Sequence, residues 1–158
     1  VRFYNNNVTR DIIQLSSDDS LDLNVFTSTI AIPWNVEHEI DYSSFVHSTS
    51  SNPSQIQVLT KGIYEVNFMF SIINKTIMRK TVRARLIKNG IDIIPYAISY
   101  SFSFNMEDDK VSHISSSFLI ELDANDYVEL VTNGQTNPGP VRLIPYENVL
   151  YMRLIREL

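Results

Sequence analysis

The feature that most constrains the fold is a strict alternation of side chains in two long segments. In residues 63–72 every second side chain is large and apolar, while the positions between them include a glutamate, an asparagine and a serine. Residues 94–104 repeat the pattern, with isoleucine, tyrosine and phenylalanine on one face and mostly alanine and serine on the other. Successive side chains of a β-strand point to opposite faces of a sheet, so a period of two predicts strands. We therefore expect both segments to be long strands.

Turn signals divide the rest of the chain into short strands. Asn89-Gly90 lies between two apolar runs, and this pair favours a type I′ hairpin because both central residues need a positive φ. Further runs typical of strands are 27–32, 43–48, 55–59, 116–122, 127–132 and 149–155. No stretch carries the apolar stripe of a helix. About ten short strands in 158 residues predict one all-β domain, a sandwich or barrel.

The first 24 residues have a different character. They contain Asn5-Asn6-Asn7 and the polar run 16–20, and their few apolar residues are scattered. We expect residues 1–24 to be an N-terminal arm or connector, ordered only where it docks on something, and residues 25–158 to be the folded domain. An ordinary frayed terminus is the alternative.

Composition excludes several classes of function. The net charge is −5 and no run of lysine and arginine occurs, so we expect no contact with nucleic acid. The absence of cysteine excludes disulfides, thiolate zinc sites and thiol catalysis. No apolar stretch is long enough to span a bilayer as a helix, so no membrane insertion is expected.

Catalytic and metal-binding patterns are weak. His38, His47 and His113 fall on separate predicted elements, and none has the partner spacing of a zinc helix. The segment 37–39 offers two carboxylates and an imidazole, although a solvated loop is the simpler interpretation. Asp123 and Asp126, like the acidic run 107–109, leave calcium open as a ligand without giving the spacing of a known calcium loop. We expect no enzyme activity, no cofactor and no catalytic residue.

Three segments, in order, resemble the tumour necrosis factor-like superfamily, which includes the globular heads of the first complement component. The first is 55–68 with Gly62-x-Tyr64, the second is 82–91 with its Asn-Gly turn, and the third is 118–130 followed by the closing run 148–155. Asn125 stands where the family usually has glycine, which is a mild departure because asparagine tolerates a left-handed backbone. The resemblance implies a jelly roll of about ten antiparallel strands that assembles as a homotrimer without catalysis.

The residues themselves suggest where chains would meet. The apolar face of 94–104 adds aromatic side chains to a core that other strands already supply, while small residues on the reverse face allow close approach. The candidates for a trimer interface are Tyr64, Tyr96, Tyr100, Phe102 and Phe104. The alternative is a strand buried wholly inside one jelly roll.

Charged positions suggest where a partner would bind. Arg83 and Arg85 share a strand face that suits a sialylated or phosphorylated partner, and Glu107, Asp108 and Asp109 lie on a predicted loop. A solvated hairpin edge and a hydrated loop are the respective alternatives.

These features predict a non-enzymatic trimeric head displayed on a virion or in the extracellular space. The leading hypothesis is a virion spike, fibre or capsid-decoration protein that contacts a capsid or other virion protein through the arm and reaches a host receptor or glycan through its loops. The bias toward Asn, Ile, Ser and Tyr and the lack of cysteine favour a phage or bacterial source. Alternatives are a secreted recognition protein of the tumour necrosis factor or lectin type, a small jelly-roll capsid protein and a small cupin-like enzyme.

Overall fold

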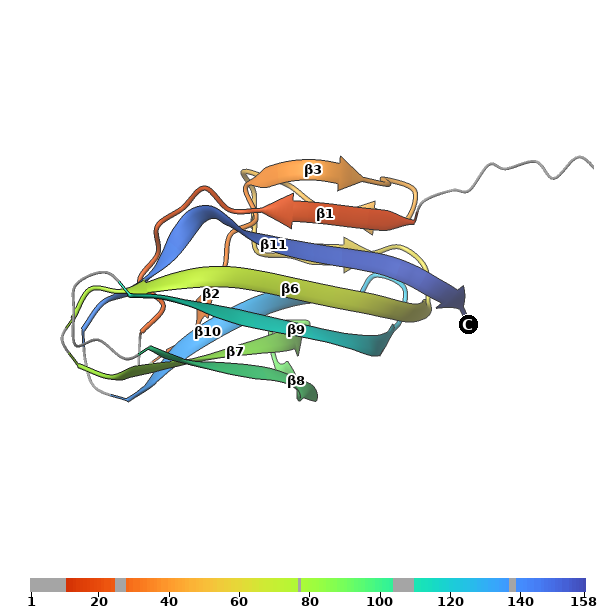
Figure 1. Ribbon diagram of the computed structural model, residues 1–158. Coiled ribbons are helices and arrows are strands. Elements are labelled where there is room, and N and C mark those ends of the chain that lie inside the picture. The colour runs from red at the N-terminus through yellow and green to blue at the C-terminus, as the bar shows by residue number, and fades with distance from the viewer. Residues whose placement is uncertain (1–10, 25–27, 77, 104–109, 137–138) are drawn as a thin grey trace, which may run out of the picture.

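The computed structural model describes residues 11–24, 28–76, 78–103, 110–136 and 139–158, and it consists of two antiparallel β-sheets packed face to face (Figure 1). Sheet A has the strand order β3-β1-β11-β6-β9, and sheet B has the order β4-β5-β10-β7-β8 with β2 paired to β10. The strands are β1 Ile12–Ser16, β2 Ile30–Ala31, β3 Val36–Ile40, β4 Phe45–Val46, β5 Ile56–Val58, β6 Gly62–Asn74, β7 Lys80–Lys88, β8 Asp92–Ser103, β9 Lys110–Leu122, β10 Tyr127–Thr136 and β11 Val141–Glu157.

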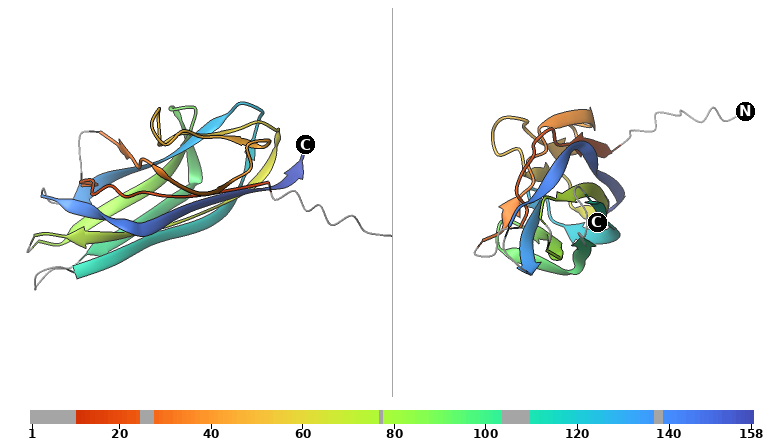
Figure 2. Two further views of the ribbon diagram at one scale, coloured as in Figure 1. Left: turned by 90° about the horizontal axis from the view of Figure 1, so that it is seen from above. Right: turned by 60° about the vertical axis from the view of Figure 1, so that its left-hand side comes forward.

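Alternation in β6 explains how the sheets pack. Tyr64, Val66, Phe68, Phe70 and Ile72 are buried and point toward sheet B, as the period of two predicts. They join Trp34 and Phe45 in one continuous core that both sheets enclose. The strands of the two sheets surround this common interior in the turned views of Figure 2. Among the described residues there is no helix with the length and apolar character needed to cross a membrane.

The predicted arm differs from the structure. Residues 11–24 belong to the domain, because β1 pairs with both β11 and β3, and Leu23 lies in the core with Ile13 and Leu15. Apolar residues of this segment that looked scattered in the sequence enter the interior, and the polar residues Ser16, Ser17 and Asn24 are buried with them. Residues 1–10 of the predicted arm lie outside the described residues.

Two tight turns form as the sequence predicts. Asn89 and Gly90 have φ values of 52° and 74°, which gives the positive pair that a type I′ hairpin between β7 and β8 requires. Asn125, in the turn between β9 and β10, has φ 72°, the left-handed backbone expected at this position. The side chain of Asn89 bonds to both the Asp126 carboxylate and the Tyr127 N–H, so the two turns support each other.

One long strand is interrupted. In β11, Leu143 pairs with Ile72 and Asn148 pairs with Phe70, so residues 144–147 bulge out of the ladder. Tyr146, within the bulge, has φ 61°. The Asn148 amide holds this geometry, because its oxygen accepts the Ser17 N–H and its nitrogen donates to the carbonyls of Ser17 and Ile144.

Candidate functional site

The outer face of sheet A carries several exposed apolar side chains. Because the inward positions of β6 and β9 fill the core, the alternate positions point outward. Met69 is 46% exposed and Leu119 is 55% exposed, and Val111 is exposed on the same face of β9. Val149 and Tyr151 of β11 lie between β1 and β6 and are half-buried. Such a face is typical of a surface that a second protein covers.

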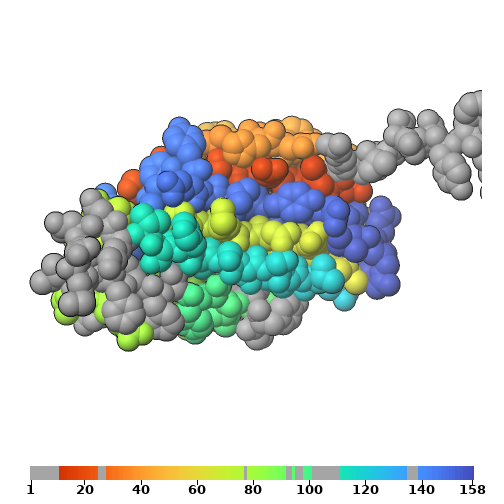
Figure 3. Space-filling model, in the orientation of Figure 1, coloured from red at the N-terminus to blue at the C-terminus, as the bar shows by residue number. Residues whose placement is uncertain are grey.

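Two hollows lie on this face. One, of about 430 Å³, is lined by Met69, His113, Val149 and the β11 bulge; the other, of about 330 Å³, is lined by Met69, Tyr151 and the small residues Ser115 and Ser117. Figure 3 shows the face, with β11, β6 and β9 running across it side by side. Small side chains between larger ones leave room for the side chains of a partner to enter.

The edge strands of the two sheets lie next to each other beside this face. Ser99 of β8 donates its hydroxyl to the Ser115 carbonyl of β9 at 3.0 Å. Tyr100 pairs with Arg83 of β7, and Ile98 pairs with Arg85, so all four point to the outside of sheet B, while Val82 and Ala84 fill the core. Tyr100 is accordingly 50% exposed.

The other interface candidates are placed as follows. Tyr64 lies wholly inside the chain, where its hydroxyl donates to the Thr60 carbonyl at 2.6 Å and burial raises its pKa to about 12. It therefore has no exposed surface to offer a second chain. Tyr96 and Phe102 belong to β8, although their side chains are outside the described part of the structure, and Phe104 lies outside the described residues.

Arg83 and Arg85 form a cationic pair on the outer face of sheet B. The Arg83 Nε–H donates to the Asn133 side-chain oxygen at 3.2 Å. The Arg85 Nε is buried without a hydrogen-bond partner, and burial, together with the charge of Arg83, lowers the Arg85 pKa. Within the described residues neither arginine forms an ion pair, so their charge is uncompensated.

The acidic positions have different environments. Glu107, Asp108 and Asp109 lie outside the described residues. Asp126 accepts hydrogen bonds from the Asn89 amide and the Asp123 N–H and pairs with Lys88 at 3.3 Å. Burial raises the Asp126 pKa, but these contacts outweigh it, and the net pKa is below its ordinary value. The carboxylate thus has a structural role in the turn between β9 and β10.

Glu37, His38 and Glu39 form part of strand β3 rather than the solvated loop the sequence predicts. Sparse apolar residues concealed this strand, which lies at the edge of sheet A. Glu37 accepts from His47 Nδ1 at 2.9 Å and from the Tyr42 hydroxyl, and the bond from His47 is the main reason that the Glu37 pKa is lowered. No group of three or more metal-ligating side chains occurs in the ranges that the structure describes.

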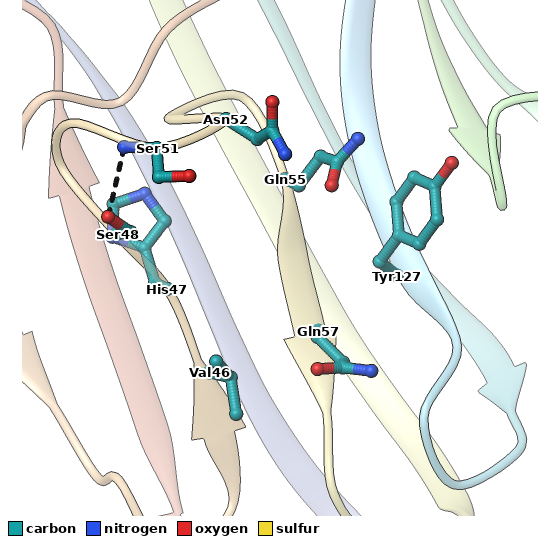
Figure 4. A pocket seen from close by; sticks show the side chains of 8 residues that line it. All are labelled: Val46, His47, Ser48, Ser51, Asn52, Gln55, Gln57 and Tyr127. Atoms are coloured by element: carbon teal, nitrogen blue, oxygen red, sulfur yellow. Dashed lines mark hydrogen bonds between the residues drawn. The ribbon is translucent and has the colours of Figure 1, made fainter.

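A polar pocket lies at the edge of sheet B, between the loop after β4 and strand β10 (Figure 4). Its volume is about 180 Å³. The residues that line it are Val46, His47, Ser48, Ser51, Asn52, Gln55, Gln57 and Tyr127. In the close view the Gln55 amide lies between the Asn52 amide and the Tyr127 ring. The loop of residues 48–54 is one of the loops expected from the sequence to face a receptor or glycan, but its position beside Gln57 and Tyr127 of other strands could not be inferred from the sequence.

Local contacts fix the shape of this pocket. The His47 ring is buried, with Nδ1 at 2.9 Å from Glu37 Oε1 and Nε2 at 3.1 Å from the Pro53 carbonyl. The same carbonyl accepts the Trp34 N–H at 2.9 Å. In the loop the Ser48 hydroxyl accepts the Ser51 N–H, and Asn52 adopts φ 52°. The loop is therefore tied at both ends to the core of the domain.

Comparison with solved structures identifies the fold. Eiger TNF from S. frugiperda is 13% identical, with a TM-score of 0.60 and 94% of each chain covered. Murine APRIL at pH 5.0 is 10% identical, with a TM-score of 0.63, 92% of this chain and 99% of that chain. The globular domain of zebrafish complement 1qA is 14% identical, with a TM-score of 0.62, 94% of this chain and 99% of that chain.

No protein-family model and no curated protein matches the sequence. At these identities the structural likeness concerns the fold, and the fold predicted from the sequence is confirmed: an antiparallel jelly roll of the type found in tumour necrosis factor and complement heads.

Proposed function

We propose that this jelly roll is the head of a non-enzymatic homotrimer that recognises a partner from a displayed or extracellular position. The observation that carries the proposal is the exposed apolar face of sheet A with its two hollows. In an isolated chain Met69, Leu119 and Val111 would contact water. A second copy of the chain that covered them would remove this unfavourable exposure.

The arrangement of the surfaces favours three copies. The face of β11, β6 and β9 is one surface, and the neighbouring edge of β8 and β9, with Tyr100 exposed, is a different one. A contact between two different surfaces is heterologous and closes only as a ring. The resemblance found in the sequence implies a ring of three, and the β8 candidates Tyr96, Tyr100 and Phe102 lie on the strand that would meet the next chain.

The assembly is tested with two methionines that differ only in location. Met69 on the face and Met78 in the loop after β6 are both 46% exposed. We expect sedimentation velocity to show a trimer for the wild type and for Met78→Lys, and a folded monomer for Met69→Lys, because a lysine charge cannot be buried unpaired in the interface. A wild-type monomer or dimer, or a trimer that survives Met69→Lys, would contradict the proposal.

Within this class we favour a virion spike, fibre or capsid-decoration role. The support is compositional: an acidic domain without cysteine, with a residue bias typical of AT-rich genomes. Attachment to a capsid through residues 1–24 loses most of its basis, because residues 11–24 are part of the domain. Immunogold labelling of purified particles tests the role, and a product found only free in the medium would favour the secreted alternative.

We also propose Arg83 and Arg85 as a contact for an acidic partner group, such as a sialic acid or a phosphate. Their charge has no counter-ion among the described residues, and guanidinium groups bind carboxylates and phosphates well. The three copies in a trimer would give a high overall avidity from individually weak contacts. Arg85→Met removes the charge but keeps the apolar stem of the side chain. We expect this variant to form the same trimer and to lose binding to cells. Unchanged cell binding would show that the arginine pair is not the contact.

A further inference from the structure

We infer that the polar pocket beside His47 binds one neutral sugar unit. The pocket lies on sheet B, on the side of β4 and β5, away from the proposed assembly face on sheet A. Sugar binding can therefore be measured on a single chain, whereas a role of that binding in attachment to a host rests on the proposed function.

Several polar side chains that line the pocket form no hydrogen bond with another described residue. Within the described part of the chain, the side chains of Ser51, Asn52 and Gln55 bond to no other residue. Gln57 uses its NH₂ group once, toward the Asn125 carbonyl at 3.1 Å, and keeps its oxygen. Amides offer donors and acceptors side by side, which matches the adjacent hydroxyls of a sugar ring.

Charge is absent among the lining residues that face the pocket. None of them is a lysine, arginine, aspartate or glutamate, and both nitrogens of His47 are engaged with Glu37 and Pro53 rather than with the pocket. A charged ligand would find no counter-ion among these lining residues. The chemistry thus favours a neutral, hydroxyl-rich ligand.

The size and shape of the pocket agree with such a ligand. A volume of about 180 Å³ is small for a ligand pocket, which suits one ring rather than an extended chain. The half-buried Tyr127 ring forms one wall and offers an apolar surface for the C–H groups of a sugar. The ties from His47 and Ser48 hold the loop in place before any ligand arrives, so little ordering entropy is lost on binding.

The test is nuclear magnetic resonance of the ¹⁵N-labelled chain with the methyl glycosides of glucose, galactose, mannose and N-acetylglucosamine, and with sialic acid as the anionic comparison. We expect millimolar binding of at least one neutral glycoside, with shifts in the side-chain amide signals of Asn52, Gln55 and Gln57. Gln55→Ala should weaken the affinity about tenfold through the lost hydrogen bonds. Gln14→Ala, the same change on β1 of sheet A, should leave the affinity unchanged.

Several results would overturn the inference. The inference would be wrong if no neutral glycoside bound at high millimolar concentration, or if sialic acid alone bound. It would also be wrong if Gln55→Ala and Asn52→Ala both left glycoside binding intact. The Met69→Lys chain should bind the glycoside as the wild type does. If the wild type were not a trimer but still bound the sugar, the proposed assembly would be rejected and the inference about the pocket would hold. If the wild type were a trimer but bound no sugar, only the inference about the pocket would be rejected.

Discussion

The Asn148 amide should contribute more to stability than any exposed asparagine, and Asn148→Ala measures by how much. The change removes the acceptor of the Ser17 N–H and the donor to the carbonyls of Ser17 and Ile144. Ser17 is fully buried, so its N–H would be left without a partner, whereas its carbonyl would keep the Tyr146 N–H at 2.9 Å.

The magnitude follows from these contacts. An orphaned buried N–H costs about 1–3 kcal/mol, and each of the other two lost bonds costs about 0.5–1.5 kcal/mol. Because the Ser17 carbonyl remains partnered, we expect Asn148→Ala to lower the free energy of unfolding by about 3 kcal/mol. The loss should also loosen the β11 bulge that lines the larger hollow on sheet A.

Urea unfolding followed by the fluorescence of Trp34 is the assay, since this is the only tryptophan and it is fully buried. All variants are compared at one protein concentration because assembly shifts apparent stability. Asn35→Ala is the control: its amide makes two hydrogen bonds, to the N–H and carboxylate of Asp18, but in an exposed position where water replaces it. We expect the control to cost less than about 1 kcal/mol. Equal losses in the two variants would refute the reasoning.

Two further changes test single features of the fold. Gly90→Ala should lower the free energy of unfolding by about 1–2 kcal/mol, because φ is +74° and the new Cβ would lie 2.9 Å from the Tyr127 hydroxyl; urea unfolding at the wild-type midpoint would contradict this. Glu37→Gln should be less stable than the wild type at neutral pH. Since the folded pKa of Glu37 is lowered from 4.5, this difference should be present above pH 4.5 and disappear as the pH falls through the folded pKa, and a difference that acid leaves unchanged would count against the His47 contact.

The sequence predicted the parts of the fold in which local pattern and tertiary position agree. Strand β6 alternates because sheet A buries one of its faces, and the Asn89-Gly90 turn needs no information from the rest of the chain. Strand β1 was missed because it is short and flanked by polar residues, so its apolar side chains read as scattered. Only pairing with β11 and β3 reveals it as part of a sheet.

The candidate sites show a different limit. A single alternation over residues 94–104 puts Ile94 and Tyr100 on one face, but a register shift against β7 separates them: Tyr100 lies outside with Arg83, whereas Ile94 packs against the core. Tyr64 read as a possible contact because an aromatic residue in a strand looks the same whether it packs within a chain or between chains. The sugar pocket joins residues 46–57 to Tyr127, which are far apart in sequence, so only the folded arrangement brings them together.

The position of β11 has a consequence for biosynthesis. This strand comes last in chain order within the domain, yet it lies in the middle of sheet A, between β1 and β6. On a ribosome, β1 and β6 would emerge with nothing between them, and sheet A would stay divided until β11 was made. The nascent domain should thus remain open to proteases and chaperones until β11 has been synthesised, and closure of the domain should follow in one cooperative step.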